Sequence, residues 1–125
     1  MKQKDIIKAY KAIEKYEQKP IPLKASYALF KTKKLIQDQI DFQNKEEQEI
    51  FRKYKPTPQE DGGLKFENQE KAVEFAKEFD AKIKEIIDID VDLGEFKKFT
   101  IPVDQIIDIS VEDIEALEPF INFEE

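Results

Sequence analysis

The chain contains no cysteine and no histidine, and only one arginine and three glycines among its 125 residues. Without cysteine there is no disulfide framework and no thiolate zinc site. Without histidine the commonest general base and the commonest neutral metal ligand are missing. The single Arg52 nearly excludes bidentate phosphate clamps, and Gly62, Gly63 and Gly94 form no phosphate-binding loop. We therefore expect a protein that is not an enzyme, with no catalytic residues, no cofactor and no metal.

Long apolar runs are also missing. No segment approaches the ~20 apolar residues of a membrane-spanning helix, and the first residues lack the apolar stretch of a signal peptide. Hydrophobic residues still make up 40% of the chain and include ten Phe and four Tyr, so a core can form without disulfides. We expect one soluble, cytoplasmic domain over residues 1–125 that has no membrane partner.

The charge is distributed unevenly along the chain. The net charge is −7, yet residues 1–37 hold ten lysines against three acids, which leaves the remainder near −14. After Lys98 every charged residue is acidic. The favoured interpretation is that the basic first helix neutralises the acidic end, within the fold or between subunits. Nucleic acid is disfavoured as a partner because such modules are usually strongly basic, whereas self-association is left open.

Two helices are predicted before residue 55. Apolar residues at steps of three and four predict the first over residues 2–18, and Pro20 and Pro22 end it. The second runs from about residue 23 to 54, about 45 Å long at 1.5 Å per residue. Its stretch Gln43–Glu49 has no apolar side chain. We expect an antiparallel hairpin over residues 2–54 whose polar part protrudes into water or faces a partner.

The rest of the chain predicts a mixed α+β fold. Residues 55–63 are expected to form a loop. Residues 64–125 are expected to hold a short strand at 64–66, a third amphipathic helix from the cap Asn68 to Ile87, and a β-hairpin. The expected strands of this hairpin are 87–93 and 99–103, the second at an edge because of Pro102. Ser110 and Asp113 have capping-box spacing and predict a short C-terminal helix that Pro119 ends.

Three acids at alternate positions, Asp88, Asp90 and Asp92, form the most conspicuous motif. A calcium EF-hand would need Gly and a bidentate acid where Leu93 and Phe99 stand. The favoured interpretation is the solvated face of a strand, with carboxylates about 6.6–6.8 Å apart. A second hypothesis is that this array, continued by the acidic end of the chain, mimics nucleic-acid phosphates.

The C-terminal segment supplies the other candidate partner-binding residues. Its acids are Glu112, Asp113 and Glu115, and its apolar tail contains Phe120 and Phe123. The favoured interpretation of the tail is that it closes the core. The alternative is an apolar anchor for a partner, since such residues dominate interface energies.

Three segments resemble a family of small uncharacterised proteins encoded by tailed phages and prophages of Gram-positive bacteria. They are the proline-rich step Pro20–Tyr27 into a long helix, the helix end Phe51–Tyr54, and the acidic segment Asp113–Ile121. The resemblance covers most of the chain, but its motifs are structural. It implies no catalytic residues, and it implies a protein that acts in the cytoplasm of the infected bacterial host or during virion assembly.

Two function hypotheses follow. The first is a non-enzymatic phage-type accessory protein with an assembly or regulatory role through protein–protein interaction. The alternative is an inhibitor of a host defence or nucleic-acid enzyme, like anti-CRISPR proteins, that uses an acidic phosphate-mimicking face. Both expect a phage or host protein as the partner.

Overall fold

The computed structural model describes residues 1–106 and 108–125, and its fold is α+β as predicted. The elements in chain order are α1 (Gln3–Glu17), α2 (Leu23–Tyr54), β1 (Thr57–Pro58), β2 (Leu64–Lys65), α3 (Gln69–Ile87), β3 (Phe99–Pro102), the 3-10 helix η1 (Val103–Gln105), α4 (Val111–Leu117) and β4 (Ile121–Glu124). The four α-helices begin and end within one or two residues of the predicted limits.

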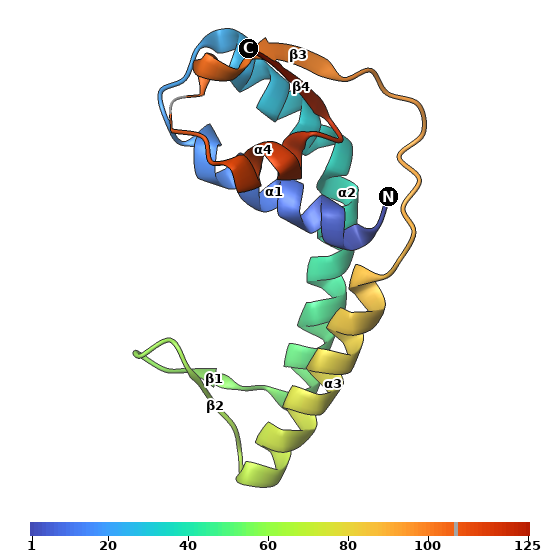
Figure 1. The fold of residues 1–125 in the computed structure, drawn as a ribbon. Helices are drawn as coiled ribbons and strands as arrows, with labels where there is room; N and C mark the ends of the chain where they lie inside the picture. The colour runs from blue at the N-terminus through green and yellow to red at the C-terminus, as the bar shows by residue number, and fades with distance from the viewer. Residues whose placement is uncertain (107) are drawn as a thin grey trace.

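Figure 1 shows that these elements form two parts. We call the first the head: it contains α1, the first half of α2 up to Ile40, and the described residues from β3 onward. The second, the stalk, spans residues 41–87 and contains the rest of α2, the β1–β2 hairpin and α3. A long connection, residues 88–98, begins at the end of α3, beside the start of the chain, and runs along the head to β3.

The head holds the hydrophobic core. The apolar face predicted for the first helix is confirmed, because Ile6, Ile13 and Tyr16 of α1 are fully buried. Leu29 and Ile36 of α2 are fully buried against it in the same core. Each fully buried aliphatic side chain of this size contributes ~1.5–3 kcal/mol. The fully buried members of this core cluster come from residues 6–40 and 101–121, and none comes from the stalk.

Two helix starts have the predicted caps. The Asn68 Oδ1 accepts a hydrogen bond from the Lys71 N–H at 2.9 Å, and the Ser110 Oγ accepts one from the Asp113 N–H at 3.1 Å. Each bond satisfies an amide that the first helical turn leaves without a partner. These caps explain why α3 and α4 begin where the sequence predicts.

The first half of α2 packs against α1, as the expected hairpin of helices requires. The second half of α2 does not protrude alone, which corrects the expectation for its polar part. It packs antiparallel against α3. Glu46 in its polar stretch pairs with Lys82 of α3 (3.6 Å), and Ile50 is only 4% exposed. The polar stretch therefore faces another helix of the same chain, through an ion pair in place of apolar packing.

The predicted β-hairpin of strands 87–93 and 99–103 does not form. Asp88 is the αR cap at the end of α3, and residues 89–93 make a single β-bridge among the described residues, between Asp90 and Lys2. Their backbone partners are the start of the chain, since Gln3 N–H donates to Ile89 O and Val91 N–H donates to Met1 O. The alternation correctly indicated that Val91 and Leu93 pack against the core. It did not indicate which segment of the chain this backbone pairs with.

Strand β3 instead pairs in parallel with the C-terminal strand β4, in the register Phe99↔Ile121 to Pro102↔Glu124. This pairing buries Ile101 and Ile121 completely. A small antiparallel sheet does occur, but it is the β1–β2 hairpin of the stalk. The predicted short strand at residues 64–66 is confirmed at Leu64–Lys65.

Candidate functional site

The acids of the connection do not form a strand face. The Asp90 carboxylate pairs with Lys2 Nζ at 3.0 Å, and the hydrogen bond and positive charge of Lys2 lower the pKa of Asp90. The Asp92 Oδ1 accepts a hydrogen bond from the Gly94 N–H at 2.8 Å. Asp88 is exposed, and its backbone carbonyl accepts from Lys2 Nζ at 3.2 Å. The even spacing of a regular strand is therefore absent from this part of the described chain.

Asp113 is used inside the head. Its Oδ2 accepts hydrogen bonds from the Tyr16 hydroxyl (2.6 Å) and from Lys15 Nζ (2.9 Å). Burial alone would raise the pKa of Asp113, but hydrogen bonds from Tyr16, Lys15 and Ser110 outweigh it and hold that pKa below its ordinary value. The interpretation that the basic first helix neutralises the acidic end within the fold is confirmed for this pair.

Glu112 and Glu115 lie beside the same basic helix. Together with Lys8 and Lys11 they line a groove of about 350 Å³ between α1 and α4. Both signs of charge face this groove, so it has no strong preference for a cation or an anion. The two glutamates are exposed, and they share this groove with lysines of α1.

The two candidate phenylalanines of the tail belong to the head. Phe120 is 1% exposed and is part of the core, so the interpretation that the tail closes the core is confirmed. Phe123 is half-buried and packs against the same core. Phe120 is therefore not available as an anchor on the surface.

An aromatic cluster in the stalk was not predicted as a unit. Phe75 of α3 lies at its centre, with ring centroids 4.9 Å from Phe66, 5.3 Å from Phe51, 5.5 Å from Phe79 and 5.8 Å from Tyr54. All five rings are only partly buried. The sequence signal was the apolar face of α3, but the partner helix was not evident because α2 was expected to protrude.

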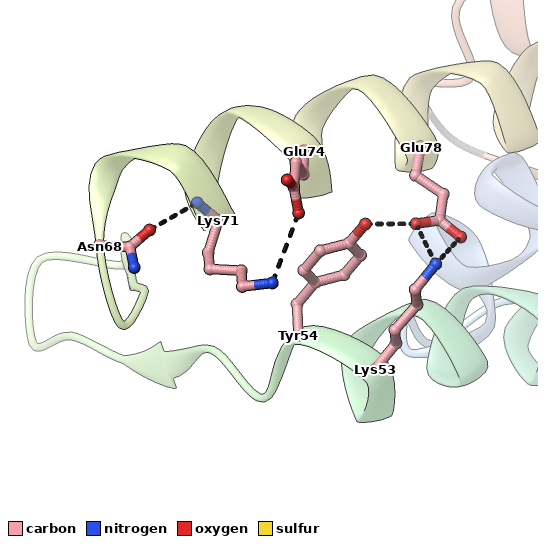
Figure 2. Close-up of polar contacts among 6 residues, drawn as sticks. All are labelled: Lys53, Tyr54, Asn68, Lys71, Glu74 and Glu78. Atoms are coloured by element: carbon pink, nitrogen blue, oxygen red, sulfur yellow. Dashed lines mark hydrogen bonds and ion pairs between the residues drawn. The ribbon is translucent and has the colours of Figure 1, made fainter.

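Beside this cluster a polar clamp ties α2 to α3. Figure 2 shows Lys53 and Tyr54, at the end of α2, directed toward Glu78 of α3. The Tyr54 hydroxyl donates to Glu78 Oε2 at 2.5 Å, and Lys53 Nζ lies 3.0 Å from the same oxygen. Hydrogen bonds from Tyr54 and then Lys53 lower the pKa of Glu78, and the bond to Glu78 raises the pKa of Tyr54. The clamp holds the end of α2 in place.

A hollow of about 810 Å³ lies next to the clamp, where the β1–β2 hairpin meets the end of α2 and the start of α3. We call it the tip pocket. Its lining residues are Lys53, Tyr54, Lys55, Thr57, Gln59, Lys65, Phe66, Glu67 and Lys71. Four of these nine side chains are lysines and one is acidic, which makes the tip pocket locally basic in a chain of net charge −7.

Lys55, directly after α2, has a strained backbone. Its φ of 45° and ψ of 52° lie in the left-handed region, and its N–H donates to Phe51 O at 2.7 Å. Glycine usually occupies this position after a helix because a β-carbon there costs on the order of 1 kcal/mol. A lysine is thus placed at the tip pocket at a small expense in stability.

In the part of the chain that the structure describes, no three acidic side chains lie close enough to hold a metal ion, and no helix is both long and apolar enough to cross a membrane. A scan against models of known protein families, a search of curated proteins and a search of solved structures each found no match.

Proposed function

We propose that this protein is a non-enzymatic accessory protein that acts by binding another protein, and that the stalk is the part that binds. The observation that carries the proposal is the composition of the core. The fully buried cluster of the head takes no residue from the stalk. The stalk is therefore a two-helix arm that the core of the head does not require.

The surface of the stalk supports a binding role. Its aromatic cluster is only partly covered, and Leu64 and Val73 are 39% and 44% exposed. A two-helix layer leaves apolar surface that a third element normally covers. A partner protein would supply that third element.

The setting we propose rests on the resemblance to proteins of tailed phages and prophages. In that setting the protein acts in the cytoplasm of the infected bacterial host, in an assembly or regulatory role. The partner is then a phage or a host protein.

The alternative, an inhibitor with a phosphate-mimicking face, has less support. Asp90 and Asp113 are paired with lysines of α1 and its flank, and Asp88, Asp90 and Asp92 do not lie on one strand. It would gain support if a captured nucleic-acid enzyme lost binding to the double variant Asp90→Lys and Asp92→Lys.

The test is affinity capture from a nuclease-treated lysate of phage-infected bacteria. Three tagged baits are compared: the wild type, a stalk variant with Leu64→Ser and Val73→Ser, and a head variant with Tyr27→Ser and Phe30→Ser. All four side chains are exposed large apolar residues, and of the two in the head variant Tyr27 also contacts the ring of Phe99, with centroids 5.8 Å apart. We expect these surface changes to leave the fold intact. We expect one near-stoichiometric protein on the wild type and the head variant, depleted at least about tenfold on the stalk variant.

Two outcomes would contradict the proposal. If the captured protein were depleted on the head variant alone, the binding surface would lie on α2 in the head. Equal recovery on all three baits would show that the stalk surface does not contribute.

A further inference from the structure

The tip pocket is basic because of how the hairpin beside it is built. Thr57 of β1 lines the pocket, and Lys65 of β2 stands opposite Thr57 in the antiparallel register and lines it too. Residues directly opposite in such a pair project to the same side. Lys55, which caps the end of α2 before β1, lines the same hollow. The hairpin thus directs Lys65 to the hollow that Lys55 reaches from the end of α2.

These two lysines differ from the other two in the pocket. Lys53 is held by Glu78 at 3.0 Å, and Lys71 lies 3.6 Å from Glu74 (Figure 2). Among the described residues, Lys55 and Lys65 make no ion pair. Glu67, the one acid that lines the pocket, makes no ion pair among the described residues either, so two positive charges and one negative charge remain outside ion pairs and the pocket keeps a net positive charge.

Helix dipoles do not account for the positive charge of the tip pocket. The tip pocket lies where α2 ends and α3 begins, and these two helix ends carry partial charges of opposite sign. The positive potential must therefore come from the lysines. The strained backbone at Lys55 is a second indication, because glycine would suit that position better and would remove the charge.

We propose that the tip pocket binds an acidic segment of the partner protein. Carboxylates of the segment pair with Lys55 and Lys65, and an apolar side chain contacts Tyr54 and Phe66 at the wall of the pocket. The proposal rests on the proposed function, because it names the chemistry that the stalk recognises.

A peptide fits this site better than a nucleic acid does. The stalk as a whole carries nine basic and twelve acidic side chains, counted over residues 41–87. A phosphate chain that leaves the pocket would meet this negative surface. A short acidic segment can place its carboxylates at the lysines and continue with neutral residues.

The experiment is a titration of the full-length protein with a fluorescently labelled short peptide, rich in glutamate and with one central phenylalanine. Anisotropy is measured from about 50 to about 300 mM NaCl, and we expect binding to weaken at least about tenfold over this range. The double variant Lys55→Gly and Lys65→Gln is expected to bind at least about tenfold more weakly than the wild type at low salt. A peptide with glutamine in place of glutamate is expected not to bind.

The controls separate charge from folding. Lys45→Gln with Lys77→Gln removes two exposed charges from the same stalk outside the tip pocket, and we expect binding within about twofold of the wild type. The Lys55→Gly change is expected to leave the melting temperature within a few degrees, because relief of left-handed strain offsets the added freedom of the unfolded chain.

Three results would overturn the proposal. They are no binding of the glutamate peptide at low salt, equal loss in the control variant, and tighter binding of oligothymidylate than of the peptide. Each is independent of the capture experiment: if the captured protein depends on the stalk surface but the peptide does not bind, the stalk keeps its role and only the acidic chemistry fails.

Discussion

Tyr16 is the residue through which the two charged ends of the chain meet. Its ring is fully buried, and its hydroxyl donates to Asp113 and accepts from the Ser110 N–H at 3.3 Å. A buried hydroxyl with two partners holds them strongly, because an unpaired polar group in that place would lose its hydration without replacement. The contact therefore fixes the start of α4 on the end of α1.

The first prediction concerns Asp113→Asn, which keeps the shape of the side chain and removes its charge. At pH 7 we expect the free energy of unfolding to fall by ~1.5–3 kcal/mol, because the carboxylate loses charge-assisted hydrogen bonds. The folded-state pKa of Asp113 is lowered. Its stabilisation is thus present above the ordinary value of 3.8 and is lost as the pH falls through the folded-state value.

Urea unfolding from pH 7 down to about pH 3 measures this difference. The difference in free energy of unfolding between the wild type and Asp113→Asn should decrease as the pH falls below 3.8, the ordinary pKa of an aspartate. Glu112→Gln, an exposed neighbour, is the control and should change stability by no more than about 0.5 kcal/mol. A gap that stays constant with pH would show that the charge of Asp113 does not contribute.

At the scale of elements, the stalk is held by the contact between α2 and α3 and by a smaller contact of α3 with α1, and Ile50 and Ile86 are the buried side chains among its described residues. α2 and α3 meet there through partly buried rings and a few ion pairs, whereas helices of the head are covered on several sides. Elements with few buried contacts open more readily than a core does. The stalk should therefore be the less stable part.

The second prediction is that Phe75→Ala loosens the stalk and spares the head. We expect a loss of about 2–3 kcal/mol, below the ~3–5 kcal/mol of a fully buried phenylalanine, because this ring is partly exposed. Hydrogen exchange should show lower protection in α3 and unchanged protection around Ile13 of α1. Val73→Ala, on the exposed side of the same helix, should leave hydrogen-exchange protection unchanged in the stalk and in the head. If Phe75→Ala lowered protection equally in both parts, the stalk would not open independently of the head.

On the scale of the whole molecule, the last residues close the head. β4 pairs with β3 and brings Ile121 into the core, and Phe120 lies directly before it. The ring of Phe96, from the connection, stacks on Phe120 with centroids 5.6 Å apart. The end of the chain thus joins the connection and the helices.

The third prediction is that a chain ending at Glu118 does not fold cooperatively. Removing a buried phenylalanine and a buried isoleucine costs about 5–10 kcal/mol together, which is comparable to the whole stability of a small domain. A chain ending at Phe123 loses only exposed residues and should unfold like the full-length protein. Circular dichroism during thermal unfolding distinguishes the two, and a cooperative transition in the shorter chain would refute the role of the tail.

Local signals were sufficient for some features of the site and not for others. The caps Asn68 and Ser110 act within four residues, so their effect is visible in sequence. The acidic array was a prediction from alternation alone, and its spacing depended on a strand that did not form. The tip pocket could not be predicted, because the pairing of Thr57 with Lys65 and the packing of α2 on α3 bring its residues together.

The sequence by itself determined the helices, their ends and the α+β class, because hydrogen bonds within a helix and caps link residues that are close along the chain. Only the tertiary structure decided which elements pair. Strand β3 has β4 as its partner, residues 88–91 lie along the start of the chain, and the far half of α2 has α3. Pairing between distant segments depends on the total apolar surface that each arrangement buries. A local sequence pattern does not contain that information.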